Sequence, residues 1–316
     1  MTTALKIEDQ HSVEPTLPLA DQQRLDRERV ADRLLKSSSK NSYDPAIEID
    51  WDAPTVPGLA YMPLHRTSLY GTALWEQMSV EQRVELSKHE IVSVARVGLW
   101  FEVLLMQMLA AHVFDADPAT KHAQYALTEI GDETRHSVMF ARFADRFGGT
   151  GYHPNRITHR LAKVFKTLAI NGPALWAGTL IAEELLDRLQ REAMNDESIQ
   201  PLCRMINRIH VVEEARHVRF AREELKRSVA NCGPLKRQWH AFLAAQAGAE
   251  ICKALIHPDV YVAVGLNKRK AKKAVRKNAN YHETRKWLGS KVMPVLEEVG
   301  MLTPAARMVY RQAHLI

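Results

Sequence analysis

The stretch His210 to His217, which reads HVVEEARH, decides how the rest of the chain is interpreted. It places His210, Glu214 and His217 at positions i, i+4 and i+7, and on an α-helix these positions share one face over two turns. The surrounding segment from Arg204 to Leu225 is rich in helix-forming residues, with apolar residues spaced among charges. Exposed helices also carry Glu and His at this spacing by chance, so the stretch alone is weak evidence for a metal site.

The signal becomes strong because the motif acid–Glu–x–Arg–His occurs twice, as DETRH at residues 132–136 and as EEARH at residues 213–217. Glu102 lies 31 residues before the motif glutamate of the first copy, and Glu183 lies 31 residues before that of the second. Each half therefore predicts a helix with a glutamate on its apolar face, a turn, and a helix with Glu-x-x-His. Four-helix bundles that hold two metal ions use this set of ligands.

The residue types suit two iron ions. Four glutamates balance the four positive charges of two Fe(II) ions, and neutral imidazole adds ligands without adding charge. A glutamate inside the apolar run LWFEVLL at residues 99–105 is costly to bury without a cation. Asp132 and Glu213, each directly before a motif glutamate, are expected to orient the histidines. An ion pair with an arginine, or a hydrogen-bonded core histidine, explains any single position more simply, but the duplicated set favours a metal site. Its six predicted ligands are Glu102, Glu133, His136, Glu183, Glu214 and His217.

With these residues, the chain resembles the ferritin-like non-haem di-iron carboxylate proteins. His210, one turn before the second Glu-x-x-His, narrows the resemblance to the AurF-type arylamine N-oxygenases, which carry a third histidine there. The resemblance thus implies His210 as a seventh ligand. It covers roughly residues 43–299 and includes the stretch from Ser68 to Glu90, with the segments SLYGT, LW, EQR and ELSKHE.

The resemblance also implies a function. The expected protein is a di-iron monooxygenase that activates O2 through a peroxo-diferric species and oxidises a small aromatic amine towards the nitro compound. It implies two iron ions, with manganese as the alternative metal, O2 as co-substrate, an external electron donor and a homodimer. Neither the identity of the amine nor the residues that bind it follow from the sequence.

Two other functions share this fold. A ribonucleotide-reductase small subunit places a radical tyrosine one turn after the histidine of the first half, where this chain has Phe140, and Tyr125 does not match that pattern. An iron-storage protein requires little beyond the bundle, whereas this chain has additional segments on both sides of it. A generic di-iron oxidase also remains an alternative.

Composition narrows the class of protein and its location. The chain is 46% apolar and 25% charged, which is typical of a soluble globular protein. Its three cysteines form no C-x-x-C pattern and its start shows no signal peptide, so a cytoplasmic location is expected. The apolar run from Val97 to Val113 is short and contains polar residues, which argues against a membrane span.

The basic run KRKAKKAVRK at residues 268–277 predicts a solvated helix face, and no motif supports nucleic-acid binding.

These patterns predict an all-α fold, a ferritin-like four-helix bundle with additional N- and C-terminal helices. Residues 1–42 are expected to form a polar, loose tail with a helix near residues 21–35, and residues 43–316 a single domain whose bundle core is at about 79–231. The capping box from Ser79 to Gln82 begins the first bundle helix. The bundle helices are predicted at residues 79–114, 119–147, 173–194 and 201–231. Further helices are predicted at residues 153–170, 235–256, 268–288 and 292–298, and the last three are expected to form a layer that walls a substrate pocket.

Overall fold

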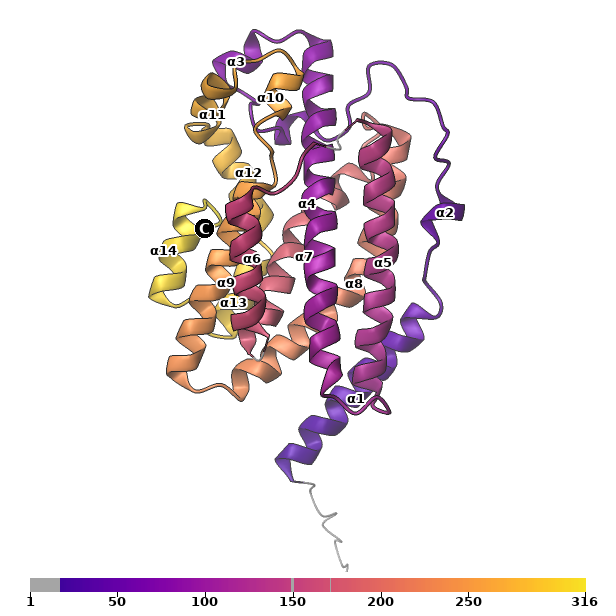
Figure 1. Cartoon of the computed structure of the whole chain (residues 1–316), viewed down its shortest axis with the longest axis vertical. Helices are drawn as coiled ribbons and strands as arrows, with labels where there is room; N and C mark the ends of the chain where they lie inside the picture. The colour runs from indigo at the N-terminus through magenta and orange to yellow at the C-terminus, as the bar shows by residue number, and fades with distance from the viewer. Residues whose placement is uncertain (1–17, 149–150, 171) are drawn as a thin grey trace, which may run out of the picture.

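The computed structural model describes residues 18–148, 151–170 and 172–316. It is all-α over these residues, with one isolated β-bridge between Ala60 and Ile199 and no β-strand in the described part. Four long helices run side by side as a bundle, with α4 packed against α5 and α7 packed against α8 (Figure 1). The bundle helices are α4 (Val80–Phe114), α5 (Lys121–Arg146), α7 (Pro173–Ala193) and α8 (Pro201–Ala230). The predicted ferritin-like bundle is therefore confirmed.

The helix boundaries follow local capping chemistry. Ser79 accepts a hydrogen bond from the Gln82 backbone N–H, and the Gln82 side chain accepts one from the Ser79 N–H, which completes the predicted capping box of α4. Proline occupies the first turn of both α7 and α8, where its missing N–H costs nothing. All four bundle helices begin and end within two residues of their predicted positions. The predicted stop at Gly149 after α5, and residue 171 before α7, lie outside the described residues.

The N-terminal segment differs from the expected loose tail. Helix α1 (Leu19–Ser38) is present and packs against α5 and α8, with Val30, Ala31 and Leu34 buried. The following link, which contains the short helices α2 (Pro45–Glu48), η1 (Leu64–Arg66) and α3 (Ala73–Glu76), runs along the outside of the bundle (Figure 1). The part of the tail before residue 18 lies outside the described residues. The apolar residues within α1 therefore attach most of the N-terminal region to the bundle.

The remaining helices cover the α7 side of the bundle. α6 (Arg156–Ala169) crosses between the two halves, and α9 (Pro234–Ala254) packs against α7. The single helix predicted at residues 268–288 is two helices, because Asn278 leaves the helical conformation and caps a new one through its side chain. A short helix precedes them at residues 260–263. The C-terminal helices are α10 (Val260–Ala263), α11 (Lys268–Arg276), α12 (Ala279–Gly289), α13 (Val292–Glu298) and α14 (Pro304–Gln312).

Helix α4 is the only described helix with the length and apolar character that a membrane crossing requires. One such helix is weak evidence for a membrane protein, because core helices of soluble proteins have the same composition. In this structure α4 carries the buried Glu102 and packs along α5. The absence of a membrane span stays a prediction.

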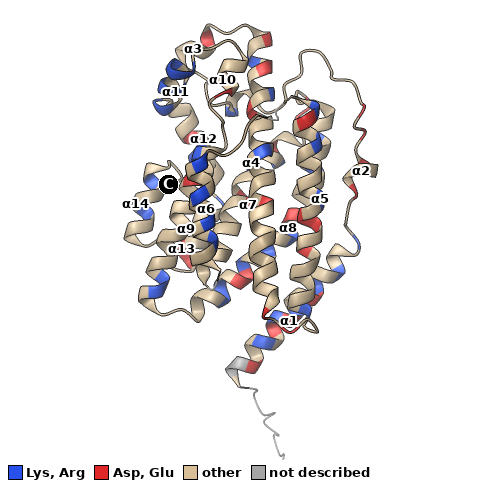
Figure 2. Cartoon of the chain, in the orientation of Figure 1, with Lys and Arg blue, Asp and Glu red and all other residues tan. Residues whose placement is uncertain are grey.

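The basic run lies on exposed α11, while acidic residues gather midway along α5 and α8 (Figure 2).

Candidate metal centre

All seven predicted ligands meet midway along the bundle. Each has a side chain that is at most 1% exposed. The ligand atoms of Glu133, His136, Glu214 and His217 all lie within 4.8 Å of one another. Two further groups of ligand atoms satisfy the same distance limit and share residues with the first. One group is Glu102, His136 and His210, and the other is Glu102, Glu133 and Glu183. Two helical repeats placed face to face therefore bring both halves of the sequence motif to one point.

The chemistry of this cluster fits bound cations. Both carboxylate oxygens of Glu102 and of Glu183 are buried and make no hydrogen bond with any described residue, and neither does Nε2 of His210. Buried polar atoms are nearly always hydrogen-bonded, and buried carboxylates need a compensating positive charge. Unpaired carboxylate and imidazole atoms directed at one point are the donor set that iron, manganese and similar ions bind.

Protonation of the glutamates supports the same conclusion. Burial raises the pKa of Glu102 well above its usual range, and the negative charges of Glu133 and Glu214 raise it further. The pKa of Glu183 is raised well above its usual range by burial and by the same neighbouring carboxylates, with Glu214 first. Four carboxylates in one buried cluster therefore resist ionising together unless cations enter. Metal binding is expected to displace protons from this cluster.

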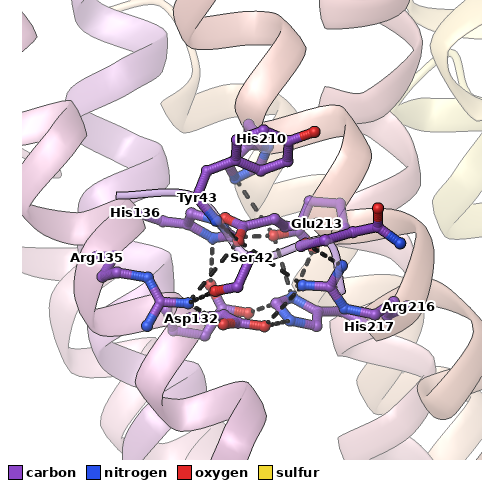
Figure 3. A network of polar contacts seen from close by, with 12 residues as sticks. Ser42, Tyr43, Asp132, Arg135, His136, His210, Glu213, Arg216 and His217 are labelled. Atoms are coloured by element: carbon purple, nitrogen blue, oxygen red, sulfur yellow. Dashed lines mark hydrogen bonds and ion pairs between the residues drawn. The ribbon is translucent and has the colours of Figure 1, made fainter. Parts of the chain in front are cut away.

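Two acidic residues hold the motif histidines from across the bundle (Figure 3). Glu213 on α8 accepts a hydrogen bond from Nε2 of His136 on α5, at 2.8 Å. Asp132 on α5 lies 3.2 Å from Nε2 of His217 on α8. Each acid thus contacts the histidine of the other repeat, and the Nδ1 atoms of both rings face the ligand glutamates at 2.9–3.1 Å. This contact fixes the ring orientation and leaves Nδ1 as the metal-binding atom.

Arg135 and Arg216 were not predicted to be site residues, although both belong to the repeated acid–Glu–x–Arg–His motif. Arg216 donates to Asp132 at 3.1 Å and to the backbone carbonyl of Asn41 at 2.8 Å. Arg135 donates to Asp132, and also to the hydroxyl of Ser42 at 2.8 Å. These contacts hold the pKa of Asp132 at about 2, because the hydrogen bonds of His217 and Arg216 and the charge of Arg135 outweigh the effect of its burial. Together they keep Asp132 ionised beside His217.

The link after α1 closes this side of the centre. The backbone N–H of Tyr43 donates to Glu213 at 3.0 Å, and Ser42 lies beside Arg135 (Figure 3). The preceding residue, Asn41, accepts the hydrogen bond from Arg216. The acids that orient the histidines are therefore covered by a segment about 90 to 170 residues away in sequence. Nothing in the local sequence of this segment indicates that role.

His210 takes the position that the family resemblance implies. Its Nδ1 lies 2.8 Å from the side-chain carbonyl of Gln190 on α7, which leaves Nε2 directed at Glu214 (3.4 Å) and Glu102 (3.5 Å). The ring of Phe140 packs against it with centroids 4.9 Å apart. The simpler explanation, a core histidine hydrogen-bonded to a carbonyl, accounts for Nδ1, but Nε2 has no hydrogen-bond partner among the described residues. Phe140 also places an apolar ring at the position where a radical tyrosine would be needed.

Another buried glutamate near the centre, Glu129, was not predicted. It lies on α5 one turn before Glu133, has no exposed surface, and neither carboxylate oxygen makes a hydrogen bond with any described residue. Burial raises its pKa well above the usual range. It is not part of the groups whose ligand atoms meet. Its four-residue spacing from Glu133 was the only signal available in the sequence.

Comparisons with known proteins agree with this geometry. A family model described as "P-aminobenzoate N-oxygenase AurF" matches residues 24–300. The uncharacterized protein MT0908 of Mycobacterium tuberculosis is 28% identical over 290 residues, covering 88% of this chain and 84% of that protein. The uncharacterized protein Mb0909 of Mycobacterium bovis is 27% identical with the same coverage. Because the family match spans most of the chain and includes every residue of the buried Glu/His cluster, the chain belongs to the p-aminobenzoate N-oxygenase AurF family.

Proposed function

We propose that this protein is a di-iron oxygenase that transfers oxygen from O2 to the nitrogen of a small aromatic amine. The observation that carries the proposal is the buried set of four glutamates and three histidines, whose unpaired oxygen and nitrogen atoms converge at one point. Membership of the N-oxygenase family supports the reaction class. Iron storage and radical generation lack a comparable supporting feature among the described residues.

The first oxidation of the amine balances in atoms, electrons and protons. An amine R–NH2, O2, two electrons and two protons give the hydroxylamine R–NHOH and water. The electrons come from an external one-electron donor, and repeated oxidation leads towards the nitro compound. Two iron ions, when bound, supply the activation of O2, and the chain supplies the ligands, the orientation of the histidines and a water-poor surrounding. The residues that would hold the iron ions are Glu102, Glu133, His136, Glu183, His210, Glu214 and His217.

One candidate path for the amine approaches the centre from the side of His210. A narrow cavity of about 30 Å³ lies there and is lined mainly by apolar residues, among them Gly98, Phe140 and Leu186. Asn207 and Gln190 add polar side chains to its wall. This volume holds about one or two water molecules, so an aromatic amine requires the lining side chains to move. Asn207 is positioned to bind a polar substituent of the amine.

A larger apolar cavity, of about 250 Å³, lies among α4, α6, α7 and α9. Residues of α9, including Leu243 and Ile251, form part of its wall. Its volume suits a single aromatic ring. Phe101 of α4, next to the ligand Glu102 in sequence, also lines it. This cavity is the second candidate for the bound amine on its way to the centre.

The test uses purified full-length protein loaded with Fe(II), supplied with O2, a reductant and a panel of aminobenzoates and anilines. We expect two irons per chain and hydroxylamine, nitroso or nitro products from at least one amine. Glu214→Ala serves as the matched control, because it removes a central ligand and should abolish both metal binding and product. Intact two-iron protein that consumes O2 without oxygenating any amine in the panel would contradict the proposal.

A further inference from the structure

Helix α5 carries a line of polar side chains that leads away from the metal centre. His122, Tyr125, Glu129 and Glu133 are spaced by three, four and four residues, so they occupy one face of the helix. None is more than 2% exposed. With a rise of about 1.5 Å per residue, this face covers roughly 16 Å from His122 to the ligand Glu133. It points into the bundle, where apolar residues are expected.

Each member of this line that is not a ligand has at least one buried polar atom without a hydrogen-bond partner among the described residues. Nδ1 of His122, the hydroxyl of Tyr125 and both carboxylate oxygens of Glu129 make no hydrogen bond with any described residue. Glu90 on α4 is also fully buried, but it accepts hydrogen bonds from the backbone N–H and the hydroxyl of Ser68. Burial of a carboxylate in this protein therefore does not by itself leave it unpaired. Buried polar groups are nearly always hydrogen-bonded, so consecutive unpaired groups on one face call for a functional explanation.

The outer end of the line reaches the surface. Nε2 of His122 lies 2.9 Å from Nε2 of His112, in the last turn of α4. His112 is partly exposed and lines an open cavity of about 850 Å³ whose wall comes from α1, α4, α7 and α8. Arg27 of α1 donates to Nε2 of His122 at 2.8 Å and pairs with both oxygens of Glu224, so the ring of His122 has a fixed position.

Apolar rings surround the middle of the line. Phe220 of α8 packs against Tyr125 with ring centroids 4.8 Å apart and against His122 at 5.2 Å. Trp176 of α7 packs against Phe220 at 5.5 Å and against His112 at 5.0 Å. All four bundle helices thus contribute a ring to this layer between the centre and the open cavity. The apolar rings leave few polar side chains in this layer, and His112 of α4 and His122 and Tyr125 of α5 are among them.

We propose that His112, His122, Tyr125 and Glu129 form a proton-transfer route, completed by water molecules, between the open cavity and the metal centre. The inference rests on the proposed function, because each first oxidation consumes two protons at a centre whose ligands are at most 1% exposed. A proton passes from the imidazoles through the Tyr125 hydroxyl, which accepts one proton and releases another, to the Glu129 carboxyl group and then to the centre. No residue on the route is consumed. The same route serves protons that metal ions displace from the buried ligands on binding.

The experiment measures proton release without turnover. Metal-free protein is mixed with Co(II) under anaerobic conditions in a stopped-flow instrument, with a pH indicator reporting released protons and cobalt absorbance reporting metal binding. The variants are Tyr125→Phe and Glu129→Gln, and the matched control is Glu90→Gln, which changes a buried carboxylate outside the route. We expect both route variants to bind two metal ions with proton release slowed by roughly tenfold or more. The control should release protons at the wild-type rate, and Glu129→Asp should restore most of the rate lost in Glu129→Gln.

Several results would overturn the route. Wild-type rates of proton release in both route variants would show that protons leave elsewhere. Loss of one bound metal ion in Glu129→Gln would place Glu129 in the metal site instead. Equal slowing in Glu90→Gln would attribute the effect to general loosening of the bundle. Because the readout requires no amine, a protein that fails to oxygenate any amine but shows slowed release in the route variants would remove the proposed function and leave the route standing.

Discussion

Glu90 gives a quantitative test of the electrostatics of this bundle. It lies in the stretch that resembles the N-oxygenase family and accepts hydrogen bonds from Ser68, whose hydroxyl also contacts that of Tyr261 at 2.9 Å. No cation pairs with it among the described residues. Burial raises the pKa of Glu90 to about 7, although the hydrogen bonds from Ser68 oppose the shift. The perturbation is Glu90→Gln, which keeps a carbonyl oxygen for the Ser68 N–H and removes the titrating group.

The pKa shift of Glu90 sets the direction and the size of the expected change in the free energy of unfolding. Between pH 4.5 and 7 the folded protein holds a proton on Glu90 that the unfolded chain has released, so the free energy of unfolding falls as the pH rises. A shift of about 2.5 pKa units, from 4.5 to about 7, corresponds to roughly 3 kcal/mol of lost stability above pH 7. At pH 5 the loss is below about 1 kcal/mol. The stability of Glu90→Gln relative to wild type should therefore rise by about 2 kcal/mol from pH 5 to pH 8.

The assay is urea unfolding of metal-free wild type and variant at both pH values, followed by circular dichroism at 222 nm. Comparing the two proteins in the same buffers cancels the groups that titrate identically in both, including the buried ligands far from Glu90. A difference between variant and wild type that is the same at pH 5 and pH 8 would refute the reasoning. It would mean that Glu90 is already ionised in the folded protein at neutral pH, stabilised by Ser68 more strongly than burial destabilises it.

Three further predictions concern the metal centre and the surface. Glu133→Ala or Glu214→Ala should abolish the two-metal site, because each removes a carboxylate that offsets a buried cation, and two irons still bound per chain by metal analysis would contradict this. His210→Ala should retain some iron through the other six ligands but alter the optical spectrum of the iron-loaded protein and slow amine oxidation. An unchanged spectrum and rate would return His210 to a structural role beside Gln190. Neutralising four exposed lysines of the basic run at residues 268–277, namely Lys270, Lys272, Lys273 and Lys277, should leave turnover intact and change mainly solubility. A lost rate with normal folding would identify α11 as a donor or partner surface.

Much of the fold could be predicted because helix boundaries are set by neighbours in sequence. The capping box at Ser79 and the prolines that open α7 and α8 place three of the bundle helices to within two residues. The same local reasoning was wrong for residues 268–288, where Asn278 caps a second helix. It also underestimated α1, whose apolar residues find a partner surface only once α5 and α8 are packed together.

The sequence by itself determined the seven candidate metal ligands, although not the arginines and Glu129 beside them. Helical periodicity is a short-range property, so Glu-x-x-His and the histidine at i−4 share a face whatever the helix packs against. The duplication at a constant spacing of 31 residues then required two equivalent halves, and the cost of burying Glu102 and Glu183 required that the halves face each other.

Only the tertiary structure decided which groups meet across the helices. Glu213 contacts His136 and Asp132 contacts His217, each on the other helix, because the register of α5 against α8 sets these pairs. The segment from Asn41 to Tyr43 covers the acids that orient the histidines, and Glu129 has no hydrogen-bond partner among the described residues. Both features depend on packing between segments far apart in the chain. Such contacts depend on the relative position and rotation of packed helices, and no local pattern in the sequence encodes either.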